Sequence, residues 1–376
     1  MIWSTPALKN TTIYEAYPYN NTGLDQIIEL RKEGDTTTND LAESRILVEF
    51  DLSRLSAVLS ENNINVNSIS ASLKLYSVQE IEVPKSYTIE ARALAASWEN
   101  GSGGPVSFGA ESTNTSVVDG ATWLTVGGLG TTTWSSSYAA ATASKQIQYN
   151  DTSSIGGGVW YTASIASQSF NYKTTDTFSV DVTNIVRQWQ TGSLPNYGFI
   201  LAFRNSEIAV DNYPETNIQF YSSNTHTVYE PQLYISWTGS ITYNTGSQSV
   251  MTYDEEPILF LRTSNKVFRK NSKIRILLGV RPRYPRPAFT QNSVFATTRA
   301  LPSASYYQIK DAHSEEIIVP FSEATKINTS PSNGYFDFYT TMMYPERYYK
   351  FEFKSVLTDA NIIFESPDYI FKIVLE

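Results

Sequence analysis

The sequence predicts an all-β protein, and three observations favour this fold class. Aromatic residues make up 13% of the 376 residues, 25 of them Tyr, a composition typical of sheets with large side-chain contacts. Segments that alternate apolar and polar residues recur along the chain, separated by Ser, Thr, Asn, Gly and Pro. Helical periodicity is confined to two short segments. We expect a jelly-roll-like β-sandwich with one or two short helices, followed by a smaller Ig-like β-sandwich.

The first predicted domain has an N-terminal extension and a main body. We expect residues 1–40 to form an arm and early strands that belong to the first sandwich, and residues 41–238 to form the sandwich itself. Segments 44–50 and 68–78 alternate as half-buried strands do, because successive side chains of a strand point to opposite faces. The Gly-, Ser- and Thr-rich stretch 101–168 predicts long surface loops.

Two segments of this domain predict short helices. The first, residues 51–60, carries Leu and Val at helical spacing. In the second, "FSVDVTNIVRQWQTG", Asp181 or Thr183 can accept a backbone N–H at the helix start, and Gly192 can end the helix. Its apolar residues recur at i, i+3, i+4 and i+7 and so share one face: Val182, Ile185, Val186 and Trp189. We expect this helix to cover an open end of the sheet core.

Several motifs follow one another in order along the first domain. They are "SRILVEFDLSRL", "SASLKLYSV", "ARALAASWENG", "TWLTVG", "FSVDVTNIVRQWQTG", "NYGFILAF" and "PQLYISW". In this order they resemble the DNRLRE family of β-sandwich domains, over roughly residues 40–238. Members of that family are similar to carbohydrate-binding modules and occur in bacterial surface proteins and phage structural proteins. The resemblance implies a β-sandwich in which Trp98 and Trp123, which fall on motif positions, pack inside.

A polar stretch, residues 239–248, is the predicted linker to a second domain over residues 249–376. Short strand candidates separated by turns indicate an Ig-like sandwich there: "PILFLR", "KIRILLGV", "SYYQIK", "EIIVPF", "YFDFYTT", "RYYKFEFKSV", "NIIFE" and "YIFKIVL". The segments "RPRYPRPAF", "LPSASYYQIKDA", "NGYFDFY" and "PERYYKFEFK", with "IYEAYPYNNTGLDQIIEL" near the start, are similar to parts of structural proteins of contractile-tailed phages. This second resemblance implies a component of a phage particle.

The net charge of −9 is unevenly distributed. Residues 1–238 hold 12 basic and 23 acidic residues, a net charge of −11, whereas residues 239–376 hold 16 and 14, a net charge of +2. Nine basic residues fall within 262–286, and no acidic residue occurs between Glu256 and Asp311. We single out six members of this basic segment as partner-binding candidates: Arg262, Arg269, Lys270, Arg281, Arg283 and Arg286.

Three roles fit such a basic segment. It can bind nucleic acid, dock an acidic protein partner, or protect an edge strand from unwanted pairing. The acidic remainder of the chain argues against nucleic acid.

Aromatic residues in the loop-rich stretch suggest a second kind of site. If they are exposed, Trp134, Trp160 and Tyr161 can stack on sugar rings or contact a neighbouring subunit. The alternative is that these rings cover the ends of the sandwich.

Nothing in the sequence forms a catalytic constellation. His226 and His313 lie in turn-like segments without a second ligand at H-x-x-x-H spacing. The adjacent glutamates at 255–256 and 315–316 would point to opposite faces of a strand, so neither pair forms an acid–base dyad. The chain has no Cys and therefore no thiol nucleophile. We expect no enzyme activity, no cofactor and no metal.

The sequence therefore predicts a structural or binding protein. No secretory signal and no apolar run of about 18 residues is visible, so we expect a protein made in the host cytoplasm, with no membrane partner. With the resemblances, this indicates a phage virion protein that mediates assembly at the neck, collar, tail or baseplate. Its partners would be other virion proteins in a symmetric homo- or hetero-oligomer, without nucleic acid. One alternative is an adhesion module that binds a host-surface glycan, and a further alternative is a depolymerase that cleaves host polysaccharide.

Overall fold

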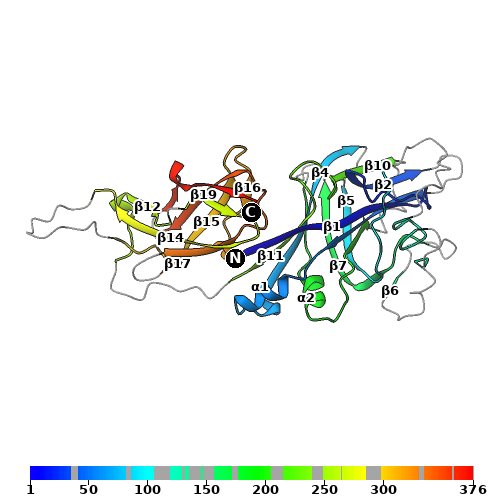
Figure 1. The fold of residues 1–376 in the computed structure, drawn as a ribbon, viewed down its shortest axis with the longest axis horizontal. Coiled ribbons are helices and arrows are strands. Elements are labelled where there is room, and N and C mark those ends of the chain that lie inside the picture. The colour runs from blue at the N-terminus through cyan, green and yellow to red at the C-terminus, as the bar shows by residue number, and fades with distance from the viewer. Residues whose placement is uncertain are drawn as a thin grey trace, which may run out of the picture. The chain divides into compact units, whose positions relative to one another are not determined.

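The computed structural model describes the chain apart from residues 35–40, 82–85, 106–118, 129–131, 135–144, 147–155, 172–176, 205–214, 239–248, 264, 285–297, 330–333, 358–359 and 376. Strands dominate the described residues, where both α-helices are short, so the predicted all-β class is confirmed (Figure 1). The chain forms two compact units. We name them the N-terminal unit (Thr5–Tyr234) and the C-terminal unit (Met1–Ser4 with Ile235–Glu376).

Two strands run from one unit into the other. These are β1 (Ile2–Tyr14) and β11 (Gln232–Trp237). Met1–Ser4, which we expected with the first domain, belong to the C-terminal unit. The reason is local: the N–H of Trp237 donates to the carbonyl of Met1 at 3.0 Å, and Ile2 packs against the core of that unit. The predicted linker, residues 239–248, lies outside the described residues.

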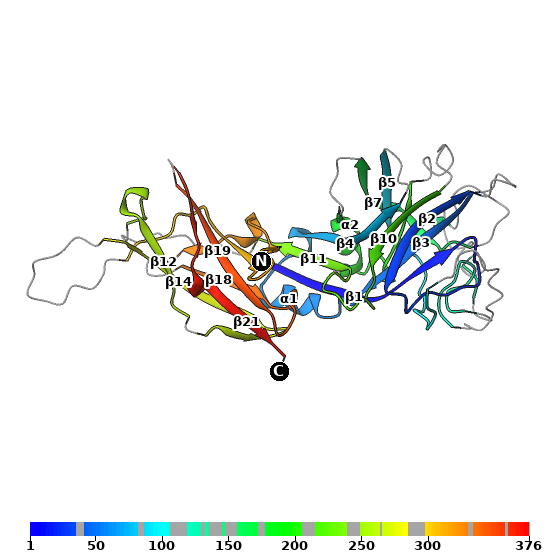
Figure 2. The same cartoon turned by 90° about the horizontal axis from the view of Figure 1, so that it is seen from above.

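Six strands of the N-terminal unit close into a ring. The ring runs β1-β11-β4-β10-β2-β3, and β1 closes it by pairing with β3. Figure 2 shows β2, β3 and β10 side by side. The sheet continues from β3 through β9, β5, β7 and β6, while β8 pairs with β4. The bounds are β2 (Ile27–Gly34), β3 (Leu41–Phe50), β4 (Ile69–Ile81), β5 (Ser86–Leu94), β6 (Lys145–Gln146), β7 (Trp160–Asn171), β8 (Thr177–Asp181), β9 (Phe199–Phe203) and β10 (Glu215–Tyr221).

This closed ring differs from the clear jelly-roll sandwich that the sequence predicts. The difference arises because β1 is 13 residues long and pairs with β11 on one side and β3 on the other. Hydrogen bonding therefore continues around the six strands, where a sandwich would have two separate sheets with open edges.

Both predicted helices are present: α1 (Leu55–Glu61) and α2 (Thr183–Gln190), with the 3-10 turn η1 (Val66–Ser68) after α1. The carboxylate of Asp181 accepts the N–H of Thr183 at 2.8 Å, and Gly192 follows the last turn at a φ of +74°. The apolar face of α2 is buried, and the ring of Trp189 lies 4.7 Å from that of Phe199 in β9. The predicted apolar face of this helix and its end before Gly192 are confirmed, whereas its N-cap residue is Val182, which has no side-chain cap.

The C-terminal unit contains two sheets. The four-stranded sheet has the order β12-β14-β18-β17, and the six-stranded sheet has the order β13-β21-β19-β15-β16, with β20 paired to β19. The strand bounds are β12 (Pro257–Leu261), β13 (Val267–Arg269), β14 (Lys273–Pro282), β15 (Ser305–Asp311), β16 (Ile317–Val319), β17 (Asn328–Thr329), β18 (Gly334–Tyr339), β19 (Tyr348–Val356), β20 (Asn361–Phe364) and β21 (Ile370–Val374). Three 3-10 turns connect them: η2 (Tyr253–Glu255), η3 (Glu323–Thr325) and η4 (Pro367–Tyr369).

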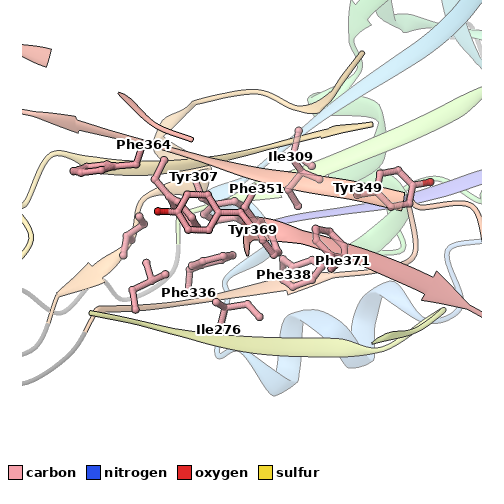
Figure 3. Packing of buried hydrophobic residues seen from close by; sticks show 14 of the residues in the cluster. Ile276, Tyr307, Ile309, Phe336, Phe338, Tyr349, Phe351, Phe364, Tyr369 and Phe371 are labelled. Atoms are coloured by element: carbon pink, nitrogen blue, oxygen red, sulfur yellow. The ribbon is translucent and has the colours of Figure 1, made fainter. Parts of the chain in front are cut away.

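An aromatic core joins these two sheets (Figure 3). Phe336 and Phe338 of β18 meet Phe351 of β19 edge to face, with ring centroids 5.4 and 5.3 Å apart. Tyr307 of β15 stacks on Phe336 at 4.2 Å. Aromatic pairs of this kind stabilise a fold beyond the area that they bury. Because side chains alternate along a strand, the remaining side chains of β14 and β18 form an outer face.

Candidate partner-binding surface

The structure separates the basic residues that are close together in the sequence. Arg262 and Arg281 belong to the four-stranded sheet, and Arg283 follows the end of β14. Arg269 ends β13, an edge strand of the six-stranded sheet, and Lys270 follows it. Since the chain passes from one sheet to the other between β12 and β13, the basic segment does not form one cluster. Arg286 lies outside the described residues.

The outer face of the four-stranded sheet carries the main group of basic side chains. The core takes Ile276, Leu278 and Val280 of β14, so the intervening residues point away from it. We call this outer surface the basic face. It is formed by Ile258, Phe260, Arg262, Lys273, Arg275, Leu277, Gly279, Arg281, Tyr335, Asp337 and Tyr339.

One glycine shapes the centre of the basic face. Gly279 pairs with Phe260 across β12 and β14. A Cβ at Gly279 would lie 2.4 Å from Cζ of Phe260 and 3.0 Å from Nε of Arg262. The ring therefore lies over the glycine, and the guanidinium of Arg262 lies 5.8 Å from the centroid of that ring. This stack holds Arg262 against the sheet.

A second guanidinium is held beside it. Arg275 donates two hydrogen bonds to the carboxylate of Asp337, at 2.7 and 2.9 Å, and lies 4.7 Å from the ring centroid of Tyr335. Hydrogen bonding to Asp337 raises the pKa of the Arg275 guanidinium further above its ordinary value. Lys273 lies 3.7 Å from the same carboxylate. Asp337 is nearly buried, whereas the side chain of Arg275 is 59% exposed and open to a further partner.

The basic face has an excess of positive charge. Its only carboxylate among the described residues is Asp337, against the four cations Arg262, Lys273, Arg275 and Arg281. In the described part of the chain, no carboxylate lies within ion-pair distance of Arg262 or Arg281. Arg262, which lies on the ring of Phe260, and Arg281 have no counter-charge among the described residues, and guanidinium groups of this kind are suited to binding carboxylates.

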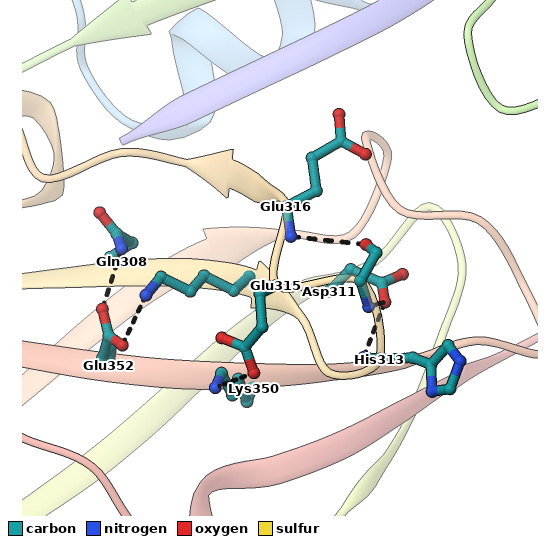
Figure 4. Close-up of polar contacts among 9 residues, drawn as sticks. Gln308, Asp311, His313, Glu315, Glu316, Lys350 and Glu352 are labelled. Carbon is teal, nitrogen blue, oxygen red and sulfur yellow. Dashed lines mark hydrogen bonds and ion pairs between the residues drawn. The ribbon is translucent and has the colours of Figure 1, made fainter.

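The other sheet of the same unit is charged very differently. On its outer face Lys310 donates to Glu352 at 2.7 Å, and Gln308 donates to the second oxygen of that carboxylate at 2.9 Å (Figure 4). Lys350 donates to Glu315 at 2.5 Å. Lys326 and Lys372 are also paired with glutamates. Of the outer faces of the two sheets, the basic face is therefore the one with an excess of positive charge.

The turn between β15 and β16 accounts for one of the two histidines. Asp311 accepts the backbone N–H groups of His313 and Ser314, each at 2.9 Å, while the imidazole points away from the carboxylate (Figure 4). The described residues contain no group of three or more His, Asp or Glu side chains that could hold a metal ion. Asp311 therefore stabilises the turn between β15 and β16.

The structure decides between the two alternatives for the aromatic candidates Trp134 and Trp160. Trp134 and Trp160 are 0% and 1% exposed, within a cluster that also holds Trp98 and Trp123. Their ring faces are not available to a sugar or a subunit in this conformation, which favours the alternative that these rings pack within the fold. Tyr161 is half-buried against the same cluster. The same cluster encloses a buried ion pair between Arg45 and Glu43. The guanidinium of Arg45 lies 4.8 Å from the ring of Trp123 and 5.2 Å from the ring of Trp160.

A tyrosine surface on the N-terminal unit escaped the sequence reasoning. Tyr229 lies 5.2 Å from Tyr76 of β4 and 5.5 Å from Tyr221 of β10, and all three rings are half-buried. Burial, with a hydrogen bond to Tyr234, raises the pKa of Tyr76 above its ordinary range. Lys74 lies 4.4 Å from the ring of Tyr76. The sequence could have indicated this surface, because Tyr76 and Tyr221 alternate with the buried apolar residues of their strands and therefore point to the outer face.

Comparisons with known proteins identify no family for this chain. No protein-family model, no curated protein and no solved structure matches this chain. The resemblances of the sequence motifs therefore stay predictions. Among the described residues, no helix is long and apolar enough to cross a membrane.

Proposed function

We propose that this chain is a structural protein of a phage particle that mediates assembly by docking an acidic protein surface on its basic face. The observation that carries the docking role is the pair Arg262 and Arg281, which lie on a sheet face without a carboxylate partner in the described residues. The position in a virion, at the neck, collar, tail or baseplate, rests on the sequence resemblances. The chain would be made in the host cytoplasm and act without a cofactor.

The same proposal includes a specific fold for each of the two units. The two sheets around one aromatic core support an Ig-like sandwich for the C-terminal unit. For the N-terminal unit, the proposal is a jelly-roll-like domain of the DNRLRE type in which part of the sheet has closed on itself. The helix α2 on the predicted motif supports this.

A protein partner suits the basic face better than nucleic acid. The face alternates guanidinium groups with Ile258, Phe260 and Leu277, and Leu277 is 39% exposed. Apolar and aromatic contacts between arginines are typical of protein interfaces. A nucleic-acid surface would need a longer basic stripe, and the chain as a whole carries a charge of −9.

The proposal is tested by reversing charge on the basic face in the producing phage. We expect the double variant R262E/R281E to fold but to be depleted at least about tenfold from purified particles, because reversed charges at an interface cost several kcal/mol. The matched control is R54E/K354E, which reverses the same number of charges on two side chains that are not buried and lie outside the basic face, and for which we expect no more than a small loss of incorporation. Equal incorporation of both double variants contradicts the docking role, and absence of the wild-type chain from particles contradicts the virion role.

The tyrosine surface favours a second candidate function, binding of a host-surface glycan. Ring faces of tyrosine can stack on the C–H groups of a sugar, while the hydroxyl groups and Lys74 offer polar contacts. This candidate predicts saturable binding of the wild-type chain on an array of host polysaccharides. Binding should be lost in Y76A/Y229A and kept in R262E/R281E. A chain that binds no polysaccharide on the array rules the candidate out.

A further inference from the structure

We infer that the acidic partner of the basic face is a second copy of this chain, which docks head to tail through one end of its N-terminal unit. The inference rests on the proposed function, because it names the partner of the same surface. We call the second surface the loop end. It consists of the connections 22–26, 99–103 and 119–122, which hydrogen bonds hold together.

The two parts of the chain carry opposite charge. Residues 1–238 have a net charge of −11, and residues 239–376 have a net charge of +2. The basic face concentrates the positive part on one sheet, with four cations and one carboxylate among its described residues. A copy of the chain therefore offers both a positive and a negative surface, and such surfaces attract each other between molecules.

The negative charge of the loop end is open to a partner. The side chains of Glu99 and Asp119 are exposed, and Asp25 is half-exposed. In the described residues, no Lys or Arg lies within ion-pair distance of these three carboxylates. Asp119 accepts hydrogen bonds from Ser102, from its N–H at 3.1 Å and its hydroxyl at 2.9 Å. Leu24 beside them is 52% exposed, which matches the exposed Leu277 of the basic face.

The loop end is also held in one shape. The amide of Asn21 donates to the carbonyls of Asn100 and Ala121, at 2.9 and 2.8 Å. Its oxygen accepts the N–H groups of Gly23 and Gly103, at 3.0 and 2.9 Å. One buried side chain thus ties the three connections together. A surface that is ordered before binding loses less entropy when a partner docks.

Two different surfaces on one chain produce a head-to-tail contact. Each copy then uses its basic face for one neighbour and its loop end for the other. Repetition of such a contact gives a ring if the rotation closes and a filament if it does not. In a ring, contacts that are weak singly become sufficient together.

Sedimentation velocity of the purified full-length chain tests the inference. We expect the mean mass to rise above one chain as concentration increases, at low salt. Association should weaken at least about tenfold between roughly 20 and 300 mM NaCl, because salt screens exposed charges. A mass that stays at one chain at every concentration and salt overturns the inference.

Two neutral double variants identify the surfaces. R262Q/R281Q removes charge from the basic face. E99Q/D119N removes charge from the loop end, while the amide oxygen of the new side chain can still accept the hydrogen bonds of Ser102. Each variant alone should remain a single chain. Mixed, they should form a complex of two chains and nothing larger, since only one intact basic face and one intact loop end remain. A variant that associates as the wild type does, or a mixture that stays unassociated, contradicts the head-to-tail contact.

The outcome is separable from that of the proposed function. If the wild type is always a single chain but R262E/R281E is depleted from particles, the partner is a different protein and the docking role stands. If the wild type associates through these surfaces and R262E/R281E still enters particles normally, the self-association stands and the assembly role falls.

Discussion

At the scale of single residues, burial determines whether an aromatic side chain can bind a partner or stabilises the fold. Trp134 shows the difference most clearly, because its ring is fully buried and its indole N–H donates to the carbonyl of Thr122 at 2.8 Å. The loop composition around it left open whether the ring is exposed or packed. In the folded chain it fills a cluster in the N-terminal unit.

We therefore expect Trp134→Ala to act on stability. The substitution should lower the free energy of unfolding by about 3–5 kcal/mol, as for other large buried aromatics. Urea unfolding followed by circular dichroism measures this. The control is Tyr284→Ala, an aromatic residue that is 75% exposed and should cost little. An unchanged unfolding midpoint for Trp134→Ala would mean that the ring is not buried in solution.

Asp311 provides a pH-dependent test at the same scale. Burial raises its pKa, but the N–H groups of Ser314 and His313 and the charge of Arg347 outweigh burial and leave the pKa lowered. A carboxyl whose folded pKa is lowered stabilises the fold above its unfolded pKa of about 3.9 and loses that contribution as pH falls through the folded value.

The variant Asp311→Asn should therefore be destabilised at pH 7 and approach the wild type at acidic pH. The measurement is the free energy of urea unfolding at neutral pH and at about pH 3, below the unfolded pKa. Asp254→Asn, on an exposed side chain, is the control. A deficit of Asp311→Asn that is equal at both pH values would show that the charge of Asp311 contributes nothing.

At the scale of elements, the basic face depends on how β12 and β14 are paired. The register places Phe260 opposite Gly279 and Ile258 opposite Arg281. This register determines which basic residues share a face. It could not be derived from the sequence, because the alternation within each strand does not show which residue of the partner strand it faces. The alternation within β14 could be derived, since Ile276, Leu278 and Val280 repeat at every second position.

Gly279→Ala tests whether that register prepares Arg262 for binding. The added methyl group would displace the ring of Phe260 and with it the guanidinium that lies over the ring. We expect a loss of about 1–3 kcal/mol in stability, as for other overpacked sites, and weaker self-association in sedimentation. Gly104→Ala is the control for the loss of stability alone, because its Cβ position has no neighbour within 4 Å but the residue adjoins the loop end. Normal association of Gly279→Ala would show that the stack is not required.

Prediction from the sequence succeeded where the signal is local. The two helices, the Asp181 hydrogen bond and the left-handed Gly192 all follow from residues within a few positions of one another. The closed ring in the N-terminal unit did not follow, because it depends on β1 pairing with a strand far along the chain. The tyrosine surface was missed for the same reason, since its rings come from distant strands.

At the scale of the whole molecule, the chain combines a negative N-terminal part with a positive sheet face in its C-terminal unit. The opposite charges explain how one sequence can supply both sides of a repeated contact. They also explain why no catalytic group is required for the proposed role, since assembly needs complementary surfaces.

The most direct test is a near-atomic map of purified phage particles from the source that encodes this chain. We predict a symmetric ring of copies in which Arg262, Arg275 and Arg281 are buried against carboxylates of a neighbour, with Glu99 and Asp119 among them if the neighbour is a second copy. A map in which the basic face is open to solvent, or in which the chain is absent, contradicts the docking role in particle assembly.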